Sequence, residues 1–476
     1  MVQAQKEGNS DWYCEISSAN NNINLQSIYQ LEGLPDEFVT SHYNALISGE
    51  SRIHIDEVIK APNHAIITIK PGTHFQLFYS TLSLDQIRSI NQKTIGEKSL
   101  AIVKVKFNFE FSPLTLSDDE IIESVFGTTV GSMNYQFKAC SYNKLSFKPA
   151  KGVGINDKGI IQLNLNINPI GKKMIDILNC CVEKVSEKIG NLQQFDHVVF
   201  FLPFGSFEEK FYNLVWGAFA VVNGRISIFN SLNGRYLSAL MHEISHNLGL
   251  THSAEHDNEY GDNTGYMGET YTKNDTPLMC FNAVHSWKLG WYEDQHVSLT
   301  PETQGISWIG KLYGVDDYQT VTQSSAVILK IESKIQNKKL YVMYNSKKGI
   351  NKETTEYANK LMVVEELNDN FSTIRGVLAR YEEFRQSNFN GNHDLVVKNC
   401  IKNGVFTNTI VFIDSSPNNM WYDARGMLYT CEWYASGQNR CATHGKSHRN
   451  FGMVASEICC YCLENFGIFR PVTTSK

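Results

Sequence analysis

Three histidines and one glutamate between residues 242 and 252 could together hold and use a metal ion. This segment reads His-Glu-Ile-Ser-His-Asn-Leu-Gly-Leu-Thr-His, so His242 and His246 are four residues apart. On an α-helix, residues four apart lie on the same face, and both imidazoles can then bind one ion. Glu243 lies beside the first histidine, where it can take a proton from water bound to that ion. The pattern indicates a catalytic zinc site.

The third histidine can reach the same ion only if the helix ends before it. On a continuous helix, His252 would lie roughly 120° away from the face that carries His246. Gly249 stands between them, and glycine adopts the left-handed conformation of a helix cap without strain. We therefore expect the chain to turn back after Leu248 and to bring in His252 as the third ligand.

The number of ligands predicts the chemistry. Three neutral imidazoles leave one of the four positions of zinc open to water, and the ion lowers the pKa of that water toward about 7. Glu243 would take the proton and deliver it to the leaving amine, while the ion polarises the scissile carbonyl and holds the oxyanion. We expect one catalytic Zn²⁺ as cofactor, no other bound cofactor, and a protein or peptide as substrate.

A methionine after the zinc segment is expected to form a turn beneath the metal, because zinc motifs of this length resemble those of the metzincins. Met267 lies between glycines in the polar, turn-rich stretch 260–268, and Met279 follows Pro277 and Leu278. The neighbouring glycines favour Met267 for the turn. Met279 is the alternative, and either residue could instead be an ordinary packing methionine.

The motifs together resemble the gametolysin family of metzincins over roughly residues 98–400. Besides the zinc segment, the resemblance rests on five stretches: a strand-like run at 100–109, Ser-Tyr-x-x-Leu-x-Phe at 141–147, Asp-His-Val-Val at 196–199, the Tyr-Gly-Asp to Met-Gly block at 260–268, and the Cys-Phe-Asn-Ala to Leu-Gly-Trp block at 280–291. The zinc and turn motifs are the specific ones.

This resemblance implies a zinc endopeptidase with a set of site residues. Carried over to this sequence, they are the ligands His242, His246 and His252, the general base Glu243 and the turn methionine Met267. Astacin-type metzincins have a tyrosine two residues after that methionine, where this chain has Glu269. A tyrosine as fifth ligand at this position is therefore excluded.

The elements that must position these residues predict an α+β protein. Before the zinc helix come a helical repeat of apolar residues at 172–189 and strand-like runs at 198–202 and 225–229. After it comes a helix at 280–289 that Gly290 closes. The resemblance implies that they form a metzincin-like catalytic domain, in which a twisted mixed sheet supports the zinc-binding helix.

Four regions are expected along the 476 residues. They are a prosegment or N-terminal accessory β-rich region at 1–97, the metzincin-like peptidase domain at 98–293, an antiparallel β-domain at 294–415 and a small Cys-rich module at 416–476. The β-domain is predicted from alternating apolar residues, as at 326–331 and 339–344.

Five of the eleven cysteines lie in the last region, namely Cys431, Cys441, Cys459, Cys460 and Cys462. Their crowding in a short segment rich in Trp, Tyr and Gly favours a disulfide-linked module. A second, structural zinc site is the alternative, because Cys459 and Cys462 form a C-x-x-C pair.

Composition excludes several partners and suggests a location. A net charge of −6 and a pI near 6.2 argue against nucleic acid, and no apolar run is long enough to cross a membrane. The first ten residues contain no apolar stretch typical of a signal peptide. The cysteines favour an oxidising environment, so we expect a secreted or cell-surface protein whose signal is absent from this sequence or replaced by another route.

The expected function is cleavage of peptide bonds in extracellular, cell-wall or matrix proteins and glycoproteins. One alternative is a catalytically silent metzincin-like protein that binds a glycoprotein or matrix through its C-terminal domains; Glu243 argues against it, because a relic has no reason to keep the base. A zinc hydrolase that acts on another bond is a further alternative.

The strand at 225–229, or the stretch 217–219 before it, could be the edge of the sheet to which an extended substrate adds as a further strand. The alternative is that it is an ordinary core strand.

Overall fold

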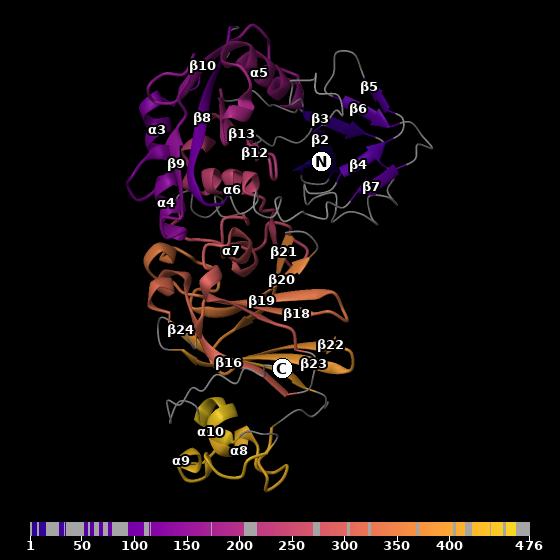
Figure 1. Cartoon of the computed structure of the whole chain (residues 1–476), viewed down its shortest axis with the longest axis vertical. Helices are drawn as coiled ribbons and strands as arrows, with labels where there is room; N and C mark the ends of the chain where they lie inside the picture. Colours follow the sequence, from indigo (N-terminus) through magenta and orange to yellow (C-terminus); the bar gives the residue numbers. More distant parts are fainter. Residues whose placement is uncertain are drawn as a thin grey trace. The chain divides into compact units, whose positions relative to one another are not determined.

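A computed structural model gives the arrangement of the chain (Figure 1). It describes residues 2–6, 9–15, 28–32, 34, 52–55, 58–60, 66–69, 75–78, 94–108, 114, 116–172, 174–203, 217–269, 277–301, 305–321, 325–367, 371–402, 406–414, 421–437, 439–450 and 454–462. The chain divides into two compact units, which we describe separately. The first comprises Met1–His252, Glu269–Pro277 and Asn368–Phe371, and the second comprises Ser253–Gly268, Leu278–Leu367 and Ser372–Lys476.

The N-terminal region of the first unit is built from strands. One sheet has the order β1-β2-β3-β6-β5, and a second pairs β4 with β7. Their bounds are β1 Val2–Lys6, β2 Asn9–Glu15, β3 Ile28–Glu32, β4 Arg52–Ile55, β5 Val58–Lys60, β6 Ile66–Ile69 and β7 Phe75–Phe78. These strands lie within residues 1–97, where the sequence predicts a β-rich region. A prosegment role for this region stays a prediction.

A six-stranded mixed sheet follows in the same unit, as predicted. Its order is β10-β8-β11-β13-β12, with β9 also paired to β8, and every pair is parallel except β12 with β13. The bounds are β8 Gly96–Phe107, β9 Leu145–Pro149, β10 Ile160–Leu165, β11 His197–Leu202, β12 Ala218–Ala220 and β13 Ile226–Asn230. All six residues of β11 are buried, as expected for a parallel strand that is covered on both faces.

Helices cover both faces of this sheet (Figure 1). Ile226 and Ile228 of β13 belong to the same core cluster as the apolar face of α5, whereas Ser227 between them hydrogen-bonds Asn247 of α6. Because neighbouring strand residues point to opposite faces, α5 and α6 lie on opposite sides of the sheet. The helices of this unit are α3 Asp118–Phe126, α4 Met133–Cys140, α5 Met174–Ile189, η1 Leu192–Gln194, η2 Ser231–Arg235 and α6 Leu237–Asn247.

The second unit begins with the strand that follows the zinc segment, β14 Ser253–Glu255, and continues with α7 Ala283–Leu289. The sequence predicts this helix from residue 280. It starts later because the side chain of Asn282 caps it by accepting a hydrogen bond from the His285 N–H at 3.0 Å. Gly290 closes it in the left-handed conformation at φ 71°, as expected.

Two further sheets lie in the second unit, mostly within residues 294–415, where the sequence predicts an antiparallel β-domain. Their orders are β14-β21-β20-β19-β18-β15 and β17-β16-β24-β23-β22. Their bounds, with the short helical turns, are β15 His296–Leu299, β16 Gly305–Tyr313, β17 Ser325–Ala326, β18 Ile328–Ser333, β19 Lys338–Asn345, β20 Lys360–Leu367, β21 Phe371–Leu378, β22 Glu383–Asn390, β23 His393–Lys402, β24 Phe406–Asp414, η4 Glu293–Gln295, η5 Val315–Thr320 and η6 Gly349–Asn351. One apolar core contains residues of both sheets, such as Leu312, Val342 and Val397. The strand pairs with β14, β15 and β17 at the edges are parallel rather than antiparallel.

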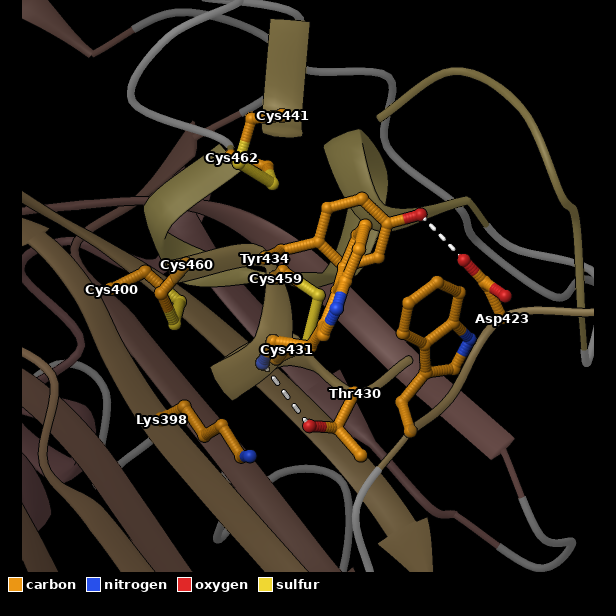
Figure 2. The surroundings of a disulfide bond; sticks show 12 residues. Lys398, Cys400, Asp423, Thr430, Cys431, Tyr434, Cys441, Cys459, Cys460 and Cys462 are labelled. Atoms are coloured by element: carbon orange, nitrogen blue, oxygen red, sulfur yellow. Dashed lines mark hydrogen bonds between the residues drawn. A yellow bond between two sulfur atoms is a disulfide. The ribbon is translucent and has the colours of Figure 1, made fainter. Parts of the chain in front are cut away.

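Disulfides hold the C-terminal module, as the sequence predicts. Cys431 pairs with Cys459, Cys441 with Cys462, and Cys460 with Cys400 of β23 (Figure 2). Since all five module cysteines are in disulfides, the alternative of a zinc site there is wrong. Sequence spacing alone could not find Cys400 as a partner, because it lies 60 residues from Cys460.

Aromatic rings and the sulfur atoms fill the small core of the module. Tyr434 is fully buried, and its hydroxyl donates a 2.7 Å hydrogen bond to Asp423 (Figure 2). The guanidinium groups of Arg425 and Arg440 lie 4.7 and 4.2 Å from the centre of a Trp433 ring. The helices are α8 Cys431–Ala435, α9 Arg440–His444 and α10 Ala455–Ile458.

Cys140 and Cys280 are also disulfide-bonded, whereas Cys180 and Cys181 on α5 are free thiols. No helix in the described ranges is long and apolar enough to cross a membrane.

We predict that replacing both Cys431 and Cys459 by alanine destabilises the module. The bond closes a loop across 28 residues. Without it the unfolded chain gains conformational entropy, which lowers the free energy of unfolding by about 3.5 kcal/mol. Limited proteolysis followed by mass spectrometry should show new cuts between residues 421 and 462. Cys180→Ala, which removes a free thiol on α5, is the control. Equal protease resistance of the double variant and the parent would contradict this prediction.

Candidate metal centre

Helix α6 carries two of the predicted ligands and is buried along its whole length. Apolar residues recur along it at helical spacing and are each at most 3% exposed, namely Leu237, Leu240, Met241 and Ile244, with Leu248 at its end. The helix packs on β12 and β13. Burial of these side chains against the sheet therefore holds the helix that presents the histidines.

The helix ends where the sequence predicts. Its last residue is Asn247, and Gly249 has a left-handed backbone with φ 96°. The Gly249 N–H donates to the carbonyl of His246 at 2.9 Å, and the Leu250 N–H donates to the carbonyl of Ser245 at 3.0 Å. These two bonds are those of a Schellman cap, which reverses the chain after a helix.

The reversal brings the three imidazoles together. Their available nitrogen atoms all lie within 4.8 Å of one another, which is close enough for one ion to reach all three. The ring centres are 4.7 Å apart for His242 and His246, 5.4 Å for His242 and His252, and 5.0 Å for His246 and His252. The two helical histidines are buried, whereas His252 is partly exposed.

A backbone carbonyl orients the second histidine. Nδ1 of His246 lies 2.8 Å from the carbonyl oxygen of Leu250. Because a carbonyl only accepts, Nδ1 must carry the proton and donate it, and this leaves Nε2 unprotonated and able to bind a metal. Metal-binding histidines are commonly held in this way by a hydrogen bond from the other ring nitrogen.

The carboxyl group of Glu243 lies next to the triad in the sequence and is 8% exposed. Burial raises its pKa to about 8. A divalent cation at the neighbouring imidazoles would act in the opposite direction, because a nearby positive charge favours the carboxylate. The protonation of the Glu243 carboxyl therefore depends on whether a cation is bound at the neighbouring imidazoles.

The donor set fits zinc. Three neutral imidazoles match the preference of this ion for nitrogen ligands, and they leave a fourth position open, as in catalytic rather than structural zinc sites. A hard cation such as Ca²⁺ or Mg²⁺ would require oxygen ligands instead.

Both candidate methionines lie in the second unit. Met267 is 1% exposed and lies in a turn, and its carbonyl accepts a 3.0 Å hydrogen bond from the Ser253 N–H. The next residue must be glycine, because a Cβ at Gly268 would lie 1.9 Å from the carbonyl oxygen of Asp262. Met279 is also buried, at 2% exposed. The role of Met267 beneath the metal stays a prediction.

The two candidates for the sheet edge can be told apart. Strand β13, predicted at 225–229, lies inside the sheet, between β11 and β12, and is a core strand. Strand β12 is antiparallel to β13 and ends the strand order in the part of the sheet that the structure describes. Of the two, only the stretch that contains Ala218 and Phe219 can be an edge.

One residue of the site was missed in the sequence. Asn247 follows His246 directly, is 1% exposed and forms four hydrogen bonds through its side chain. The only indication in the sequence is that a polar residue stands at the end of a largely apolar helix. Its partners lie 20 to 50 residues away, so their identity could not be read from the zinc motif.

Comparison with known proteins agrees with the motifs. The model of a sequence family described as gametolysin peptidase M11 matches residues 108–400, which is more than half of the chain. An autolysin of Chlamydomonas reinhardtii is 40% identical over 55 residues, which are 12% of this chain and 8% of that protein. The match thus spans a small part of the length of this curated relative. No solved structure matches the chain.

We predict that Gly249→Ala lowers both stability and zinc affinity. A side chain at φ 96° costs about 1–2 kcal/mol, and its Cβ would lie 2.8 Å from Oδ1 of Asn223. Chemical denaturation would measure the loss of stability. Competition with a chromophoric chelator would measure the loss of zinc affinity.

The matched control is Gly290→Ala, at another left-handed helix end with no atom within 4 Å of the added Cβ. It should lose about 1–2 kcal/mol through the same backbone strain and keep its zinc affinity. If Gly249→Ala bound zinc as tightly as the parent, the chain reversal would not be what assembles the ligands.

Proposed function

The chain belongs to the gametolysin peptidase family M11, and from this membership we propose that it is a zinc-dependent endopeptidase. The observation that carries the proposal is the convergence of His242, His246 and His252 around one point beside the buried Glu243. Membership in a family of peptidases supports cleavage of peptide bonds, and the set of three imidazoles supports zinc as the ion. Both agree with what the eleven-residue motif predicts on its own.

In this proposal the residues of the chain have separate tasks. His242, His246 and His252 hold the ion, and the Leu250 carbonyl keeps His246 in the required tautomer. When bound, zinc supplies a Lewis acid that polarises the scissile carbonyl and makes water acidic enough to ionise near neutral pH. Glu243 takes the proton of the attacking water and passes it to the leaving amine. Its burial keeps bulk water from competing for that proton.

The substrate is proposed to bind in extended form along β12. This strand is antiparallel to β13 and ends the described strand order, so a peptide can add to it as a further strand through backbone hydrogen bonds. Met267, buried in its turn, is proposed to support the site as the metzincin turn methionine.

The substrates are proposed to be extracellular, cell-wall or matrix proteins and glycoproteins. The disulfides of the C-terminal module support an oxidising, extracellular location. The stretch shared with the autolysin of Chlamydomonas reinhardtii is consistent with this location. We accordingly propose that the protein is secreted or lies at the cell surface.

We predict that Glu243→Ala still binds about one zinc per chain but loses activity. Removing the general base while keeping all three imidazoles should lower kcat/KM by about three orders of magnitude. The measurement is cleavage of a mixed peptide library, with and without a zinc chelator, together with the zinc content of both proteins. The activity of the parent should be lost with the chelator and restored by added zinc.

Asp257→Ala is the matched control, because this carboxylate lies close to the zinc segment in the sequence but is exposed. It should cleave the library like the parent. Equal cleavage by Glu243→Ala and the parent would contradict the mechanism. Zinc binding without cleavage of any peptide by the parent would favour the alternative of a silent, metzincin-like binding protein.

A further inference from the structure

The side chain of Asn247, next to the candidate metal centre, forms four hydrogen bonds. Its Oδ1 accepts from Ser227 Oγ at 2.9 Å and lies 3.3 Å from Nδ1 of His197. Its Nδ2 donates to the carbonyls of Val221 at 2.9 Å and Ile226 at 3.1 Å. The amide therefore joins the end of α6 to β11, to β13 and to the turn between β12 and β13.

Chemistry permits only one orientation of this amide. The carbonyls of Val221 and Ile226 can only accept, so both must face the NH₂ group. The oxygen then faces Ser227 and His197, and the imidazole must carry its proton on Nδ1. Both N–H groups and both lone pairs of the amide are used. A rotation of Asn247 would leave several buried polar groups without partners, which is costly, so the side chain is fixed.

The same turn also holds the backbone of the metal-binding residue. The N–H of Asn223 donates to the carbonyl of His246 at 2.8 Å, and that carbonyl also accepts from Gly249 at 2.9 Å. The peptide group between His246 and Asn247 is thus fixed by the turn on one side and by the helix cap on the other. A small shift of the turn would move His246 with it.

We propose that Asn247 is a positioning residue that sets the place of His246 in the metal centre and thereby the affinity for zinc. It touches neither the ion nor the substrate and acts through the adjacent ligand. Residues that orient metal ligands typically contribute 10- to 100-fold to metal affinity. The inference rests on the proposed function only in taking zinc as the ion that the three histidines bind.

The test compares variants of the full chain by zinc affinity. Asn247→Asp keeps the size and the acceptor but loses both donors and places a carboxylate against two carbonyls. We expect its dissociation constant for zinc, measured with zinc alone against a chromophoric chelator, to rise 10- to 100-fold at a temperature well below its Tm.

A control separates positioning from general stability. Ile228 lies on the same strand as Ser227 but faces α5, and it is fully buried. Ile228→Ala should lower the Tm at least as much as Asn247→Asp, because truncating a buried Ile leaves a cavity in the core. It should still leave the zinc affinity within about twofold of the parent.

A milder variant keeps the test decisive if Asn247→Asp does not fold. Ser227→Ala removes one of the two donors to Oδ1 and should weaken zinc binding in the same direction by a smaller factor. The inference would be overturned if Asn247→Asp bound zinc as tightly as the parent. If that variant does not fold, parent-like zinc affinity in Ser227→Ala would overturn it. An equal loss of zinc affinity in Ile228→Ala would also overturn it. These results do not depend on cleavage, so a parent that binds zinc but cleaves no peptide would contradict the proposed function alone.

Discussion

The candidate centre depends on one constraint of the backbone, namely that the chain must reverse within a few residues of the end of α6. A helix can offer two imidazoles on one face, but a third nitrogen has to come from outside it. The left-handed Gly249 permits this reversal, and the cap bonds of Leu250 and Gly249 to the helix hold it. The carbonyl of Leu250 also accepts a hydrogen bond from Nδ1 of His246, so the same turn gathers the ligands and orients one of them.

The sheet supplies what the helix cannot supply alone. Every residue of α6 is buried, and the helix ends against the turn between β12 and β13. This burial raises the pKa of Glu243 to about 8, which would keep the base protonated near neutral pH in the absence of a nearby cation. A bound divalent ion favours the carboxylate instead. In this account, binding of the metal is what makes Glu243 an ionised carboxylate that can accept a proton.

Much of this arrangement could be predicted from local sequence. The spacing of His242 and His246, the glycine after them and the apolar repeat of α6 all act within a few residues, where helix geometry fixes the outcome. Strand β11 is equally clear from its continuous apolar run. What could not be predicted depends on partners distant in sequence. The hydrogen bonds of Asn247, the link from Cys460 to Cys400 and the parallel edge strands of the β-domain exist only once the chain has folded.

The most direct test of the central claim is an anomalous-difference map from crystals of the full chain that contain one equivalent of zinc, collected at the zinc absorption edge. The account predicts one strong peak at about 2.0–2.1 Å from a nitrogen of each of His242, His246 and His252, with a remaining position open to solvent. A peak elsewhere in the molecule, or one that leaves His252 outside bonding distance, would contradict it.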